Sequence, residues 1–82
     1  MYKVLITNAA QKGARNIPDD YYSIIVKHIF DLAKNPRPHG YKKLTKDTYR
    51  IRVGVYRIIY TIQDDILTVN VIKIDHRSSV YK

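Results

Sequence analysis

The 82-residue sequence contains no cysteine and no glutamate, and all seven of its acidic residues are aspartates. Without cysteine the chain can form neither disulfides nor thiolate metal sites, which is typical of proteins from a reducing cytoplasm. The chain offers few carboxylates for catalysis by a pair of acidic side chains, and no cluster of Asp and His has the spacing of metal ligands. We therefore expect a protein with no metal site and no cofactor.

Long hydrophobic runs are missing as well. No segment approaches the roughly 18 apolar residues of a membrane span, and the opening MYKVLITN is too short and too polar for a signal peptide. We expect a soluble, cytoplasmic protein with no membrane partner. The length suits one small domain that occupies residues 1–82.

Positive charge is what the sequence has in excess. Fifteen Lys and Arg residues against seven Asp give a net charge of +8. A small basic cytoplasmic domain most often meets nucleic acid or an acidic protein. Six of the cations lie between residues 41 and 60, with Asp47 as the only acid: Lys42, Lys43, Lys46, Arg50, Arg52 and Arg57. The three lysines are predicted to form a phosphate-binding surface.

The stretch YRIRVGVYRIIY, residues 49–60, predicts a β-hairpin because its residue types alternate with period two around Gly54-Val55. Glycine at the first central position suits a two-residue type II′ turn, which needs a positive φ there. In that register Arg52 lies opposite Arg57, and like charges in this position destabilise a sheet by roughly 0.2–1 kcal/mol. The opposite face carries only apolar and aromatic side chains. The cost of placing Arg52 opposite Arg57 indicates that Arg50, Arg52 and Arg57 form a functional cluster rather than a solvated face.

The remaining pattern predicts an α+β fold. A strand is expected at 2–7, a short helix within 8–16, and a second helix from Pro18 to about Lys34, with Asp19 and Asp20 in its first turn. Short strands follow around 42–45, 48–53 and 56–62, and a last strand at 66–74. We expect one antiparallel sheet with the two N-terminal helices packed on one of its faces.

The C-terminal residues are predicted to run beside the arginines. A two-residue loop at Asp64-Asp65 would pair Arg57 with Ile72, and by parity His76 would then share the arginine face. The tail after the last strand is rich in groups that transfer protons or donate hydrogen bonds. A basic strand face beside such a tail suits chemistry on a phosphate.

The run YRIRVGVYRIIY, an acidic turn, ILTVNVIKI and HRSSVY resembles the RelE superfamily of toxins from type II toxin–antitoxin modules. The resemblance is strongest over residues 43–81 and covers nearly the whole chain. It implies a twisted antiparallel sheet with two helices on one side. It further implies a ribosome-dependent mRNA endonuclease that acts in the ribosomal A site of prokaryotes and is neutralised by an acidic RelB-like antitoxin.

The resemblance also implies a catalytic set, in which a 2′-OH attacks its own 3′-phosphate without a metal. The positions that match the family pattern are Arg50, Arg52, Arg57, His76, Arg77 and Tyr81. Several family members have lysine where this chain has Arg50 and Arg52. Arginine stays protonated in proteins and cannot act as a base, so the proton acceptor is expected to be His76 first and Tyr81 second.

Two other functions fit the sequence. One is a ParE-like toxin of the same fold that acts on DNA gyrase, against which the arginine cluster argues. The other is a degenerate basic module that only binds its antitoxin, because the lysine-to-arginine departures could have removed the activity.

Overall fold

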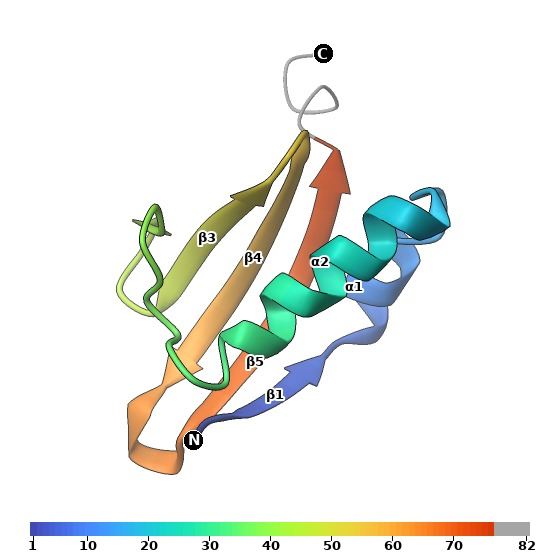
Figure 1. Cartoon of the computed structure of the whole chain (residues 1–82). Helices are drawn as coiled ribbons and strands as arrows, with labels where there is room; N and C mark the ends of the chain where they lie inside the picture. The colour runs from blue at the N-terminus through green and yellow to red at the C-terminus, as the bar shows by residue number, and fades with distance from the viewer. Residues whose placement is uncertain (77–82) are drawn as a thin grey trace.

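Five strands form one twisted sheet in the order β1-β5-β4-β3-β2 in the computed structural model, which describes residues 1–76 (Figure 1). The strands are β1 (Lys3–Ile6), β2 (Lys42–Lys43), β3 (Thr48–Val53), β4 (Tyr56–Gln63) and β5 (Thr68–His76). The helices are α1 (Asn8–Gly13) and α2 (Asp19–Asp31), and a 3-10 turn spans Asp64–Ile66. The α+β class predicted from the sequence is confirmed.

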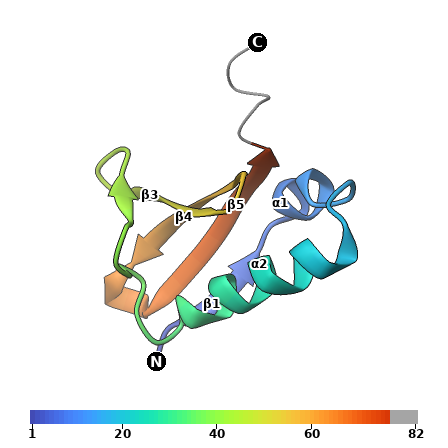
Figure 2. The same cartoon turned by 45° about the horizontal axis from the view of Figure 1, so that its top comes forward.

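Both helices lie on the same face of the sheet, as expected (Figure 2). The α1 helix begins where the Thr7 hydroxyl accepts a hydrogen bond from the Ala10 amide at 3.2 Å. The α2 helix begins after Pro18 with Asp19 and Asp20 in its first turn, where negative charge favours the helix dipole. The start of α2 was predicted from Pro18, Asp19 and Asp20, whereas the Thr7 cap of α1 was not identified from the sequence.

The hydrophobic core lies between the helices and the sheet. Full burial of an Ile or Leu side chain stabilises the fold by roughly 1.5–3 kcal/mol. Ile25 and Ile29 of α2 are buried, as is Leu32 directly after the helix. The predicted apolar face of the hairpin is buried in full: Tyr49, Ile51, Val53, Tyr56, Ile58 and Tyr60. The arginines between them must therefore point to the face that the helices leave uncovered.

The β3–β4 hairpin has the predicted register. Gly54 adopts a φ of +62°, as the type II′ turn requires. Arg52 pairs with Arg57, and Arg50 pairs with Ile59. The hairpin therefore follows from its two-residue turn alone.

The β4–β5 register differs from the predicted one. The chain makes a 3-10 turn instead of a two-residue loop, and Leu67 then adopts a left-handed φ of +48°. A bulge at Ile59/Tyr60 shifts the pairing once more. As a result Arg57 pairs with Asp75 rather than Ile72, and His76 pairs with Tyr56.

The sheet is mixed rather than wholly antiparallel. Strands β2 to β5 pair antiparallel as predicted, but β1 pairs parallel with β5, with Lys3 beside Thr68 and Ile6 beside Val71. Parallel neighbours need a long connection, and almost the whole chain separates these two strands. No turn in the sequence indicated this direction. Neither helix within residues 1–76 is long and apolar enough to cross a membrane.

Candidate functional site

Cationic side chains from four strands gather on the sheet face opposite the helices. Residues paired directly across antiparallel strands point to the same side, so one row runs Arg52, Arg57, Asp75 across β3, β4 and β5. The next row runs Lys42, Arg50, Ile59, Lys73 from β2 to β5. We call the cations of these rows the arginine face: Lys42, Arg50, Arg52, Arg57 and Lys73.

Arg57 is held by a carboxylate within this face. Its Nε donates to Asp75 Oδ1 at 3.2 Å, and its Nη2 donates to Asp75 Oδ2 at 3.3 Å. The two side chains are only 17% and 16% exposed. The Lys73 ammonium lies 3.5 Å from the same carboxylate. Asp75 therefore offsets the like-charge contact between Arg52 and Arg57.

Lys73 and Asp75 were not assigned to this face from the sequence. A strict alternation of buried and exposed residues along β5 would not place Lys73 and Asp75 on this face. The bulge interrupts the alternation, because Ile72 and Lys73 are both exposed between the buried Val71 and Ile74. The sequence alone did not indicate this bulge, because Ile72 is apolar like the buried residues around it.

The three predicted phosphate-binding lysines do not form one patch. Lys42 pairs with Arg50 and joins the arginine face. Lys43 pairs with Tyr49 and points to the helix side, where its Nζ lies 5.9 Å from the Tyr49 ring centroid. Lys46 lies in the loop between β2 and β3.

His76 does not lie on the arginine face, contrary to the parity prediction. It pairs with Tyr56, whose side chain belongs to the core, and the two rings meet edge-on with centroids 5.2 Å apart and planes at 89°. The cause is the bulge. The longer turn moves Ile62 from Leu67 to Val69, which preserves the parity, whereas the bulge adds one residue and reverses it. Arg77 and Tyr81 lie outside the described residues.

A second polar cluster lies beside the β4–β5 turn and serves structure. Arg37 Nη2 donates to Asp64 Oδ2 at 2.9 Å, and the Tyr2 hydroxyl donates to Asp64 Oδ1 at 2.5 Å. The Arg37 hydrogen bond lowers the pKa of Asp64, and the bond to Asp64 raises the pKa of Tyr2. Burial raises the pKa of Tyr60 to about 12, and its hydroxyl donates to the Pro36 carbonyl at 2.8 Å. These contacts join the N-terminus, the 35–41 loop and the sheet.

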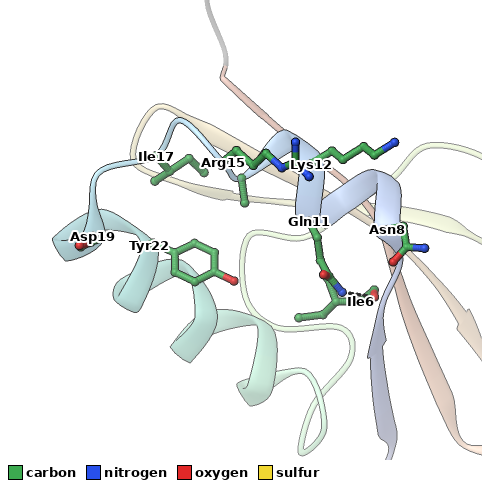
Figure 3. Close-up of a pocket in the computed structure, with 9 residues that line it drawn as sticks. Ile6, Asn8, Gln11, Lys12, Arg15, Ile17, Asp19 and Tyr22 are labelled. Carbon is green, nitrogen blue, oxygen red and sulfur yellow. Dashed lines mark hydrogen bonds between the residues drawn. The ribbon is translucent and has the colours of Figure 1, made fainter.

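A cavity of about 590 Å³ lies on the helix side, between α1 and the start of α2 (Figure 3). Its lining includes Ile6, Lys12, Arg15 and Tyr22, and Gln11 Nε2 closes one wall by donating to the Ile6 carbonyl at 3.2 Å. This cavity is separated from the arginine face by the sheet. Among residues 1–76, no group of three His, Cys, Asp or Glu side chains could hold a metal ion.

Known proteins resemble this chain over nearly its whole length. The family model described as the ParE toxin of the type II toxin–antitoxin system parDE matches residues 4–81. Toxin RelG of Mycobacterium tuberculosis is 32% identical over 85 residues, which cover 99% of this chain and 97% of RelG. Toxin RelE of the same organism is 33% identical, covering 99% of this chain and 87% of that toxin.

Solved structures share the fold. The toxin–antitoxin complex RelBE2 from M. tuberculosis contains a chain with a TM-score of 0.81 and 31% identity, with 93% of this chain and 98% of that chain covered. The archaeal RelE–RelB complex from Pyrococcus horikoshii gives a TM-score of 0.83 at 28% identity, with 93% and 94% covered. The isolated E. coli RelE toxin gives 0.80 at 26% identity, with 99% and 92% covered.

Proposed function

This chain belongs to the RelE/ParE-like superfamily of toxins from type II toxin–antitoxin systems, and we propose that it is a ribosome-dependent mRNA endonuclease that inhibits translation. The observation that supports this activity most directly is the arginine face. It gathers five cations on the sheet surface opposite the helices, where Asp75 holds Arg57 at two points.

The proposed reaction is attack of a 2′-OH on the adjacent 3′-phosphate, which yields a 2′,3′-cyclic phosphate and a free 5′-hydroxyl. Negative charge builds up on the phosphate oxygens in the transition state. Guanidinium groups suit this charge because their planar fork grips phosphate oxygens at two points. Arg50, Arg52 and Arg57 therefore bind the scissile phosphate and stabilise its transition state, while Lys42 contributes to RNA binding.

Proton transfer falls to the C-terminal segment. Arginine cannot give up its proton, and His76 packs its ring against Tyr56 on the core side. We therefore assign the proton transfer to Tyr81, the second candidate from the sequence, and assign Arg77 to the phosphate. Both assignments rest on the family resemblance and concern residues outside 1–76.

The proposed partners are the ribosomal A site with its mRNA, and an acidic RelB-like antitoxin in the same cytoplasm. The solved structures from M. tuberculosis and P. horikoshii are complexes of a toxin with its antitoxin. The net charge of +8 suits an acidic antitoxin segment.

The proposal is tested with purified toxin, programmed ribosomes and mapped mRNA ends. The Arg57→Ala variant should cleave about 10²–10³-fold more slowly than the parent, the usual loss for one donor that stabilises transition-state charge. Arg15→Ala is the matched control, because it removes the same charge from the helix side, and it should cleave at the parent rate. Equal loss in both variants would show that net charge, not the arginine face, carries the activity. Thermal unfolding of each variant verifies its fold.

The ParE-like alternative is favoured by one finding, because the matching family model is that of the ParE toxin. A toxin of this kind would inhibit supercoiling by DNA gyrase and leave ribosome-bound mRNA intact. A chain that does neither yet binds its antitoxin would be the degenerate module.

A further inference from the structure

The contact between Arg57 and Asp75 occupies one edge of the guanidinium and leaves another edge open within residues 1–76. The side edge, Nε with Nη2, donates to both oxygens of Asp75 at 3.2 and 3.3 Å. Because the guanidinium is planar with its N–H groups in a fixed fork, contact at two points fixes both its plane and its rotation. The N–H groups of Nη1 and the outer N–H of Nη2 point away from the carboxylate.

We propose that Asp75 is a positioning residue that holds Arg57 with this open edge presented to the scissile phosphate. The inference rests on the proposed function. An arginine that is already oriented loses less conformational freedom when the phosphate binds, and it needs no reorganisation as the charge develops.

The neighbouring charges make this role necessary. Arg52 lies directly opposite Arg57 on one side, and Asp75 lies directly opposite it on the other. Without the carboxylate, repulsion from Arg52 would displace the Arg57 side chain. Asp75 also holds the Lys73 ammonium at 3.5 Å, and because the Lys73 side chain is 61% exposed it remains accessible to RNA. One carboxylate therefore orients two cations of the arginine face.

A carboxylate near a phosphate site could instead be an obstacle that repels RNA. The two roles predict opposite effects of its removal. An obstacle, once neutralised, leaves both RNA binding and cleavage stronger. A positioning residue, once neutralised, leaves RNA binding as strong or stronger, because the net charge rises, while cleavage slows.

The test compares Asp75→Asn, which keeps the shape but loses the charge and one acceptor, with Asp47→Asn, which makes the same charge change in the exposed loop before β3. Single-turnover cleavage on programmed ribosomes should slow about 10²-fold in Asp75→Asn, the usual cost of a small displacement of a reacting group. Asp47→Asn should keep the parent rate.

Affinity for an RNA oligonucleotide with a 2′-deoxy scissile nucleotide should be equal in the two variants. In an Arg57→Ala background, Asp75→Asn should cause a much smaller further loss, because only its contact with Lys73 then remains to be lost. A rate at or above the parent's in Asp75→Asn would overturn the inference.

A second measurement does not depend on cleavage. In NMR spectra of the free parent toxin, the Arg57 Nε–H should give a distinct, slowly exchanging signal that shifts when inorganic phosphate is added. In Asp75→Asn the signal should move to the averaged position of solvated arginines. If the parent does not cut mRNA, the proposed function fails, but the NMR measurement still tests whether Asp75 holds Arg57 in a fixed orientation. If the Arg57 Nε–H is already averaged in the parent, the inference fails whatever the cleavage rate and whether or not the variant folds.

Discussion

His76 shows how far the role of one residue depends on a single register shift. The sequence places it two positions after Ile74, in a segment that the family resemblance marks as catalytic. The structure turns its ring to Tyr56 on the core side and brings Asp75 to Arg57 instead. At the residue scale, the acid beside the arginines is Asp75, which orients Arg57, and His76 packs against the Tyr56 ring.

Two substitutions separate His76 from Tyr81. We expect His76→Gln to cleave ribosome-bound mRNA at close to the parent rate, because the ring lies off the arginine face. Tyr81→Phe should slow cleavage about 10²–10⁴-fold, the usual worth of a positioned acid or base. Single-turnover rates at neutral pH measure both, with the circular dichroism of each variant as the control for folding. The reverse pattern would assign the proton to His76 and would require its side chain to reach around the end of β5.

At the scale of elements, α1 packs on β5 more closely than any side chain other than glycine allows. A Cβ on Gly13 would lie 2.1 Å from the Ile74 carbonyl oxygen. The oxygen belongs to backbone, so it cannot move aside as a side chain could. This contact places α1 beside the end of β5 that carries Asp75.

Gly13→Ala should destabilise the fold, although alanine stabilises an isolated helix by about 1 kcal/mol over glycine. Overpacking typically costs about 1–3 kcal/mol, and a contact with rigid backbone belongs at the upper end. Urea unfolding measures the change, with Lys12→Ala on the same helix as the control that should change little. A Gly13→Ala variant as stable as the parent would mean that α1 can lift from β5 at no cost.

The elements also show what the sequence could and could not predict. The β3–β4 register was predictable because Gly54 and a two-residue turn determine it locally. The β4–β5 register was not, because Leu67 gives no sign of its left-handed φ and the bulge at Ile59/Tyr60 lies inside an unbroken apolar run. Likewise, nothing local sets the direction of β1. The sequence therefore predicted that the three arginines share one face, and it did not predict their acidic partner.

At the scale of the whole molecule, positive charge covers both sides of the sheet. The arginine face lies on one side, and Lys12 and Arg15 border the cavity on the other. A partner with acidic segments therefore meets cations on both sides of the sheet, which raises its rate of encounter.

Association with the antitoxin should slow steeply as salt is added. The net charge of +8 attracts an acidic segment at long range. At physiological ionic strength, salt limits the range of this attraction to about 8 Å. Stopped-flow association rates between about 10 mM and 1 M NaCl test this across the range over which screening changes. The dissociation rate serves as the internal comparison, because it should vary much less. An association rate that does not change with salt concentration would show that apolar docking governs the encounter.

The parallel pairing of β1 with β5 sets the order in which the protein can mature. The first strand to be synthesised lies against the last, and β5 is inserted between β1 and β4. Until β5 has been translated and has left the ribosome, β1 has no neighbour in the sheet and Arg57 has no Asp75. Long-range pairings of this kind also form slowly. A nascent chain therefore cannot join β1 to the sheet, or complete the arginine face, before β5 has been made and is free to pair.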